Sequence, residues 1–260
     1  MMIRRLLCVA SVSALSAPPL KHVARWPPEG TDASARWSEG EAGPLGRGVD
    51  AWAESRFRAG LLKEVGGDDT YASGFEGIVE IANLFAKRGA EEARKAARRV
   101  LCSLFPDWPP SPEGGVGLLY WFDILFARPF PAFSAKLNAA ATFAFGHWLM
   151  GPLELGDLEE ERAEVGDGRG QLVLVRRCRF LEESRCASVC VNACKMPTQD
   201  FFNEDMGVPL RIEPDYETLE CRFKFGLRPT EADEAEARSV ACLATCPNNG
   251  RLLHLNCDKM

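Results

Sequence analysis

Cysteine is the residue type whose distribution most clearly suggests chemistry in this sequence. The chain has 260 residues and ten cysteines, and eight of the cysteines fall between residues 178 and 257. Such a density is typical of a disulfide-bonded scaffold or of a metal-binding module. The eight are Cys178, Cys186, Cys190, Cys194, Cys221, Cys242, Cys246 and Cys257. The carboxy-terminal third of the chain is therefore where we expect a functional site.

Three of these cysteines, Cys186, Cys190 and Cys194, follow one another at intervals of four residues. The segment around them has a helical composition, and we expect its helix to end at Pro197. On a helix the three side chains project from neighbouring rows of one face. The outer pair would lie about 12 Å apart along the axis, whereas a sulfur ligand lies about 2.3 Å from a zinc ion. One ion can therefore take two of them with partners from elsewhere, unless the helix unwinds.

Cys246 is our candidate for a remote fourth ligand. It follows Cys242 in the string CLATCP and directly precedes Pro247. A larger iron–sulfur cluster relaxes the distance limit, and a remote cysteine followed by proline is one of its usual ligands. Cys178 and Cys221 would then be further ligands or would surround the ligands. We favour a metal centre over disulfides and over passive burial, although free cysteine is often simply a small buried side chain.

Other chemistries lack their sequence signatures. The chain has no GxGxxG motif, no phosphate-binding GKS or GKT and no GxSxG, so hydride transfer, phosphoryl transfer and serine hydrolysis are not indicated. His22, His147 and His254 have no ligand spacing to a second histidine or an acid, which argues against a two-histidine carboxylate iron site. We expect His147 to be a hydrogen-bonded core residue. With 31 basic and 37 acidic residues, a nucleic-acid partner is not expected.

Composition and hydrophobic periodicity predict a globular α+β protein that is mainly helical. Hydrophobic residues make up 46% of the chain and charged residues 26%, which are ordinary globular values. The patterns predict helices over 50–65, 71–87, 91–104, 116–126 and 132–150, and strands over 171–175 and 219–225. The second strand places Cys221 on its buried face. We therefore expect a helical region over 50–155, followed over 171–257 by a small cysteine-rich domain with a few strands.

The most apolar part of the chain lies between residues 116 and 150. Each half is too short or too interrupted for a secure membrane span, since Asp123, Lys136 and His147 lie within it. A pair of apolar helices most often forms plain core. The alternative is that the pair forms the wall of a pocket for a hydrocarbon ligand, open towards a membrane.

The amino-terminal residues 1–48 are expected to be a targeting leader and linker. Arg4 and Arg5 precede an apolar run from Leu6 to Leu15, in the order of a secretory signal. The next segment has no acidic residue before Glu29. A signal followed by an acid-poor transit segment indicates import into a plastid with extra membranes, and simple secretion is the alternative. Secretion would favour disulfides, whereas a reducing stroma would favour thiolate ligands.

The segment from 178 to 226 also carries a dense, ordered set of features that we recognise. They are Cys178-Arg179, Leu181-Glu182, Cys186, Cys190-Val191-Asn192, Cys194-Lys195, Pro197-Thr198-Gln199, Phe201-Phe202, Gly207, Pro209-Leu210, Cys221 and Phe225-Gly226. In these features the chain resembles the carboxy-terminal region of the plastid β-carotene isomerase family, which initiates strigolactone synthesis in plants, together with its algal relatives. The likeness extends more loosely upstream, to about residue 53.

This resemblance implies an iron-dependent conversion of all-trans-β-carotene to its 9-cis isomer in the plastid. Under it we expect iron, mononuclear or in an iron–sulfur cluster, on Cys186, Cys190, Cys194 and Cys246. The substrate would be a carotenoid, peripheral contact with plastid membranes is expected, and the electron donor is not identified. An algal relative without strigolactones could act on another carotenoid.

Elementary chemistry is compatible with that implication. A carotene offers no acidic proton and no carbonyl, so acid–base side chains have little effect on it. A redox-active iron that passes one electron could lower the order of a carbon–carbon double bond without net oxidation. Two alternatives stay open: an iron–sulfur electron carrier, and a zinc-stapled carotenoid- or lipid-binding protein, because zinc supplies no redox chemistry.

Overall fold

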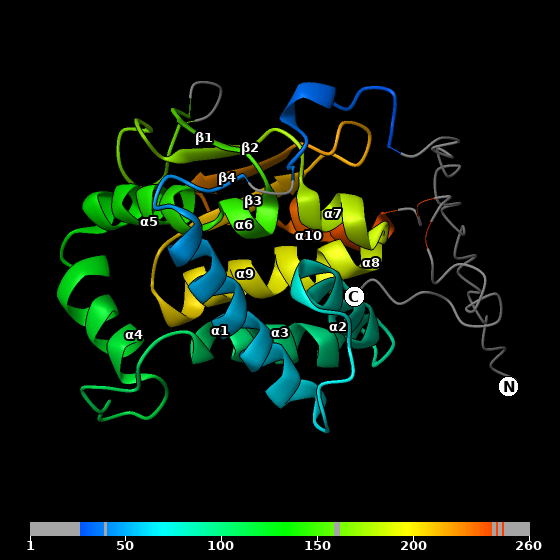
Figure 1. The fold of residues 1–260 in the computed structure, drawn as a ribbon. Coiled ribbons are helices and arrows are strands. Elements are labelled where there is room, and N and C mark those ends of the chain that lie inside the picture. The colour runs from blue at the N-terminus through cyan, green and yellow to red at the C-terminus, as the bar shows by residue number, and fades with distance from the viewer. Residues whose placement is uncertain (1–26, 39–40, 159–161, 241–242, 244–245, 247–260) are drawn as a thin grey trace, which may run out of the picture.

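A computed structural model of the chain describes residues 27–38, 41–158, 162–240, 243 and 246 (Figure 1). The expected signal at residues 4–17 lies outside the described residues, as do Cys8, Cys242 and Cys257. His22 and His254 lie outside them as well. Part of the expected linker is described and contacts the rest of the protein: Arg177 donates to the carbonyl of Asp32, and Ala35 is buried.

Three predicted helices are confirmed in the amino-terminal half. They are α1 (Arg47–Val65), α2 (Gly74–Ala86) and α3 (Ala90–Ser103). In α3, Ala93, Ala97 and Val100 form the buried stripe, and Glu91 and Glu92 lie at the amino end, where the helix dipole favours negative charge. In Figure 1, α2 and α3 lie on the side of the molecule opposite the sheet, and α1 runs across from beside α6 (His147–Met150) to α3.

The apolar region forms α4 (Gly117–Phe122), a π-helical turn η2 (Asp123–Ala127), α5 (Pro131–Phe145) and the short α6 (His147–Met150). The single helix predicted over 132–150 is therefore divided at Gly146. A Cβ at that position would lie 2.6 Å from the carbonyl oxygen of Thr142 and 2.5 Å from the Cε of Met150. Only glycine allows these groups to approach so closely.

The described part of the chain contains a four-stranded antiparallel sheet with the strand order β1-β2-β4-β3. The strands are β1 (Leu153–Gly156), β2 (Leu172–Val175), β3 (Leu210–Pro214) and β4 (Cys221–Phe225). The predicted strands correspond to β2 and β4, and Cys221 is buried as expected. The second strand begins at residue 221 rather than 219, because Leu219 has a φ of 65° and belongs to the preceding turn. In Figure 1, α5, α6 and α9 lie between the sheet and α3.

The cysteine-rich segment is one long helical run after α7 (Arg179–Ser184). It comprises α8 (Ala187–Val189), the π-helical η3 (Cys190–Lys195), α9 (Met196–Asp200) and the π-helical η4 (Phe201–Asp205). The prediction that Pro197 ends the helix is wrong. Pro197 lies in the first turn of α9, directly after the wider π turns of η3, where the helix changes geometry and proline's missing N–H is tolerated.

The last described helix is α10 (Glu231–Ser239), which the sequence analysis did not predict. Thr230 and Asp233 form a capping box at its start. None of the helices in the described ranges combines the length and the apolar character that a membrane crossing requires. The overall class is the expected one, mainly helical α+β.

Candidate functional site

Four buried or half-buried cysteines from three parts of the chain line one small cavity. They are Cys178, Cys190, Cys194 and Cys221, and we call them the thiol cluster. The cavity has a volume of about 10 Å³ and is otherwise lined mainly by apolar side chains, such as Met150. That volume is at the lower limit for one water molecule. The cluster therefore lies in a nearly dry, close-packed environment.

The sheet explains how Cys178 and Cys221 come together. Val175, the last residue of β2, pairs with Cys221, the first residue of β4. Cys178 follows Val175 by three residues, and its N–H donates to the carbonyl of Leu219 at 2.8 Å. The Cys178 sulfur also accepts a hydrogen bond from the N–H of Leu181 at 3.4 Å, which caps the start of α7. The two thiols thus lie at the same end of the sheet.

Cys190 and Cys194 reach the cavity from the π-helical η3. They are four residues apart, and both line the cavity with the two sheet-end cysteines. Burial raises the pKa of Cys190 to about 12 and that of Cys178 to about 11, and the neighbouring sulfurs of the cluster raise that of Cys190 further. The pKa values of Cys194 and Cys221 are also well above the usual range, mainly because of burial. At neutral pH all four are therefore uncharged thiols.

The predicted ligand set differs from this cluster. Cys190 and Cys194 belong to both sets, whereas Cys186 and Cys246 are buried but do not line the cavity. The carbonyl of Cys186 accepts from the N–H of Cys190, and the N–H of Cys246 donates to the carbonyl of Leu243.

The described residues do not fit a bound metal ion as they are arranged. Within the described ranges, no group of three or more His, Cys, Asp or Glu side chains is placed to hold one. None of the seven described cysteines forms a disulfide. Iron on Cys186, Cys190, Cys194 and Cys246 therefore stays a prediction.

A larger apolar cavity of about 390 Å³ lies between α1, α3, α5, α6 and η4. Its walls include Phe57, Leu101, Phe105, Thr142, Trp148 and Phe202. The sequence analysis gave the wall of a pocket for a hydrocarbon ligand as the alternative interpretation of residues 116–150. This interpretation is supported for the second half of that region, since α5 and α6 line the cavity. Residues 116–126 do not line it.

A third, small cavity of about 40 Å³, which we call the linking cavity, adjoins both of these spaces. It shares Phe57, Leu101 and Leu149 with the apolar cavity, and it shares Phe180 and Cys194 with the thiol cavity. Cys194 is half-buried, unlike the other three thiols of the cluster. The three cavities therefore form a row from the open apolar cavity to Cys194, in which each cavity shares wall residues with the next.

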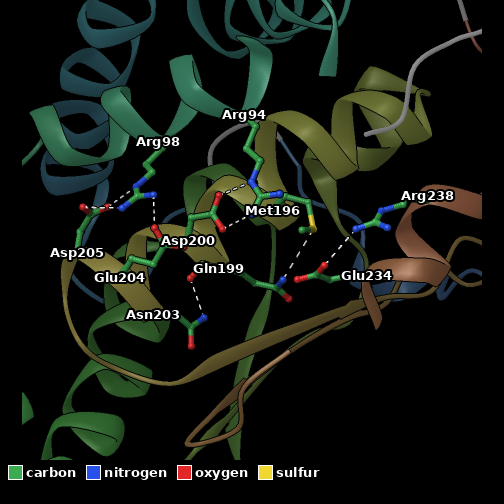
Figure 2. A network of polar contacts seen from close by, with 10 residues as sticks. All are labelled: Arg94, Arg98, Met196, Gln199, Asp200, Asn203, Glu204, Asp205, Glu234 and Arg238. Carbon is green, nitrogen blue, oxygen red and sulfur yellow. Dashed lines mark hydrogen bonds and ion pairs between the residues drawn. The ribbon is translucent and has the colours of Figure 1, made fainter. Parts of the chain in front are cut away.

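Ion pairs hold α9 and η4, which carry wall residues of these cavities, against α3, as Figure 2 shows. Arg94 forms a two-pronged contact with Asp200, in which Nη2 lies 2.5 Å from Oδ1. Arg98 binds Asp205 in the same way, at 2.7 and 2.9 Å, and also contacts Glu204. Two-pronged pairs fix direction as well as distance. Phe201 and Phe202, which line the apolar cavity, lie between these anchor points in the sequence.

Amide side chains tie the same helix to the sheet. The Oε1 of Gln199 accepts from the N–H of Ile212 in β3 at 2.7 Å. The Nδ2 of Asn203 donates to the carbonyls of Gln199 and Leu210 at 2.7 and 2.9 Å. Gln199 is buried, so these bonds also satisfy groups that water does not reach. Side chains directed towards α3 and towards the sheet therefore fix the position of α9 and η4.

Two polar residues lie near the thiols without having been predicted as site residues, although Lys195 is part of the Cys194-Lys195 feature of the sequence. Lys195 is only 3% exposed and lines both the thiol cavity and a polar cavity of about 310 Å³ on its other side. Tyr216 lines the polar cavity and faces the Cys190 thiol, and its pKa is raised mainly by burial. Nothing in their spacing marks either residue, since a turn and a strand bring Tyr216 to η3.

His147 corrects a further prediction. Its ring packs edge-on against Phe143, with the ring centres 5.2 Å apart, but its Nε2 is buried with no hydrogen-bond partner among the described residues. The expectation of a hydrogen-bonded core histidine is therefore wrong. Burial lowers the pKa of His147, and the nearby Asp50 carboxylate opposes that shift.

Comparison with known proteins identifies the segment that contains the thiol cluster. Residues 148–234 match the family model described as beta-carotene isomerase D27-like, C-terminal. This segment is similar to the C-terminal domain of that family. The matched segment holds all four thiols of the cluster, whereas Cys246 lies outside it and the α1, α3 and α5 walls of the apolar cavity precede it.

Two curated relatives carry the same name. The protein "Beta-carotene isomerase D27, chloroplastic" from Arabidopsis thaliana is 34% identical over 126 residues, which are 48% of this chain and 46% of that protein. Its namesake from Medicago truncatula is 33% identical over 108 residues, which are 42% of this chain and 41% of that protein. The matches thus span about half the length of these relatives or less. No solved structure matches the chain.

Proposed function

We propose that this chain isomerises a carotenoid, most specifically all-trans-β-carotene to its 9-cis form. Two relatives named as beta-carotene isomerases are 33–34% identical to parts of the chain, and residues 148–234 match a family model of the same description. The observation that carries the proposal is the run of apolar walls from the open cavity to Cys194. Such a cavity suits a hydrocarbon, because it offers contact area and few polar groups that binding would leave unpaired.

The chain's own residues bind and orient the polyene in this proposal. Phe57, Trp148 and Phe202 present aromatic surface to its conjugated system. The dry interior keeps a reactive intermediate away from water. Ion pairs from α3 hold the wall residues of η4 in place, so that the double bond to be turned lies at a fixed depth. No acid or base faces Cys194 from the linking cavity, which suits a substrate without acidic protons.

Iron dependence is part of the proposal as the sequence resemblance implies it. Bound iron would supply one-electron chemistry. Because the described thiols are not arranged to hold an ion, no step here is assigned to it. Metal analysis of protein purified without oxygen tests this part: iron in stoichiometric amount supports it, whereas zinc alone would remove the redox chemistry.

A plastid location is proposed with it. The relatives are named chloroplastic, and the acid-poor leader of this chain suits import through a signal and a transit segment. Secretion is the competing destination. A fluorescent fusion of residues 1–48 in an algal host would distinguish the two.

The central experiment is incubation of the purified full chain with all-trans-β-carotene, followed by chromatography of the isomers. Enrichment of the 9-cis isomer above the uncatalysed mixture is expected. Cys194→Ala should lower the rate by about tenfold or more, equivalent to about 1.4 kcal/mol of barrier per factor of ten. Cys102→Ala is the matched control, since Cys102 is a half-buried free thiol outside all three cavities.

The outcomes separate the candidate functions. Carotenoid binding without isomer enrichment, in metal-loaded protein, would refute the isomerase and favour the binding protein. A visible spectrum of an iron–sulfur cluster with neither binding nor isomerisation would favour the electron carrier. Equal rates for the Cys194 and Cys102 variants would exclude a role for the thiol cluster in the reaction.

A further inference from the structure

One face of α5 exposes large apolar side chains of a kind that is normally buried inside a protein. Phe130 is 59% exposed and Phe133 is 54% exposed. Leu125 and Phe126 of η2 and Leu137 of α5 are exposed beside them. We call these five residues the α5 stripe. Contiguous exposed apolar groups of this kind mark interaction sites rather than ordinary surface.

The α5 stripe leads to the mouth of the apolar cavity. Phe133, Leu137, Ala141 and Phe145 follow one another at intervals of four residues, so they lie along one side of the helix. Ala141 and Phe145 line the cavity, and Phe145 is itself 46% exposed. Trp52 lines the cavity from α1 and is exposed as well. The exposed apolar surface and the cavity are therefore continuous.

Charge around this surface differs from that of the chain as a whole. The protein carries a net charge of −6, yet no Asp or Glu occurs from Ile124 to Leu153. Arg128 and Lys136 lie along the α5 stripe and pair with Asp123 and Asp167 at its edges. Arg56 is exposed at the cavity mouth and makes no ion pair within the described ranges. The face thus combines apolar side chains with basic ones.

We propose that the α5 stripe rests on the surface of a lipid bilayer and that the cavity mouth at Phe145 and Trp52 opens towards the lipid. Exposed aromatic side chains with basic neighbours are the groups that partition into the interfacial region of a membrane with anionic lipids. The helix would lie in the interface rather than cross it, since α5 has only 15 residues. In Figure 1, α4 and α5 lie at one edge of the molecule, where a flat surface can reach them.

A bilayer suits this face better than a second copy of the chain. Two copies would bring together two acidic proteins, whereas an anionic bilayer meets a face whose cation without an ion pair in the described ranges is Arg56, beside the carboxylate-paired Arg128 and Lys136. The docking inference rests on the proposed function for one point only, namely that the molecule taken up through the cavity mouth is a carotenoid. A carotene dissolves in lipid and not in water, so a cavity that takes it from a membrane should open beside the docking surface.

Vesicle flotation without carotenoid tests the docking. The full chain should float with vesicles of phosphatidylcholine and phosphatidylglycerol, and less with phosphatidylcholine alone. The double variant Phe130→Ser, Phe133→Ser should bind at least about tenfold less. Leu155→Ser is the control, because Leu155 is a similarly exposed apolar residue of β1 outside the α5 stripe, and it should bind like the wild type. Far-ultraviolet circular dichroism confirms that each variant is folded.

Two results would overturn the proposal. One is equal flotation of the wild type and the double variant. The other is a lipid-free dimer that the double variant abolishes, since the α5 stripe would then be an interface between copies. Arg56→Gln should reduce binding to the anionic vesicles alone, and an equal loss with both vesicle types would contradict the contribution of charge.

A separate readout keeps this inference apart from the isomerase. Isomerisation of β-carotene is measured with substrate supplied in vesicles and in detergent. The double variant should be slowed only with vesicles. If neither protein isomerises carotene but the wild type still floats, the docking stands and the proposed function fails. If both proteins act equally on vesicle-borne carotene, the docking fails and the function stands.

Discussion

Replacing Asp200 by Asn should destabilise the protein by about 2 kcal/mol. The change removes the charge that pairs with Arg94, while the shape of the side chain is kept. The Asp200 side chain is 11% exposed and that of Arg94 is 31% exposed, so the ion pair is neither fully buried nor fully exposed. Fully exposed pairs contribute about 0–1 kcal/mol, whereas breaking a buried pair costs about 3–5 kcal/mol. For a protein of this size the loss corresponds to a fall in Tm of roughly 4–8 °C.

The assay is urea unfolding followed by circular dichroism, with Lys95→Met as the matched control. Lys95 pairs with Glu91 on the same helix, but both side chains are more than half exposed, so its replacement should cost no more than about 0.5 kcal/mol. A cycle with Arg94→Met isolates the coupling of the Arg94–Asp200 pair. Equal losses for Asp200→Asn and Lys95→Met, or a coupling near zero, would refute the view that this pair clamps the helix to α3.

Three other changes probe the cavities and the core. Leu149→Phe places a larger side chain in the wall that the apolar cavity and the linking cavity share. Chromatography of the isomers should show slower isomerisation, while carotenoid absorbance should show that binding is retained. Unchanged turnover would argue against a route from the apolar cavity to Cys194. Ile78→Ala removes a fully buried side chain and should lower the free energy of unfolding by about 2–5 kcal/mol in urea titrations. Burial lowers the pKa of His147, so below about pH 6.5 the unfolded state binds the proton before the folded state does and the free energy of unfolding falls. His147→Gln should reduce that fall, measured as the urea midpoint between pH 7.5 and 5.5. Identical pH profiles for the variant and the wild type would disprove this role of His147.

Much of the fold was predictable because its signals are local. The apolar period of α2 and α3 and the alternation of Leu219 to Phe225 depend only on neighbours in the sequence. β1 and β3 were not predicted, and their length does not explain this, since β2 and β4 are equally short. The continuation of the helix past Pro197 was missed because π turns leave no clear mark in the sequence.

A gathering of cysteines was predictable from the sequence, but not which cysteines form it. Helical spacing brought Cys190 and Cys194 to one face, and that face is indeed the one that lines the thiol cavity. Cys178 and Cys221 join them through the pairing of Val175 with Cys221, a contact between residues 46 apart in the sequence. Such long-range pairing decides which of several similar cysteines meet, and spacing along one helix cannot supply it.

The π turns of η3 also make this segment tolerant of one change in chain length. A π turn arises where one extra residue is inserted into an α-helix, and its wider turn absorbs that residue. Deleting a single residue from Cys190–Lys195 would therefore restore an ordinary α turn with little rotation of the residues beyond it. Deleting a single residue from the α-helical Met196–Asp200 would instead rotate the residues beyond it by about 100°. Phe202 would then leave the cavity wall, and Asp205 would turn away from Arg98. A one-residue deletion should thus be far more damaging in α9 than in η3.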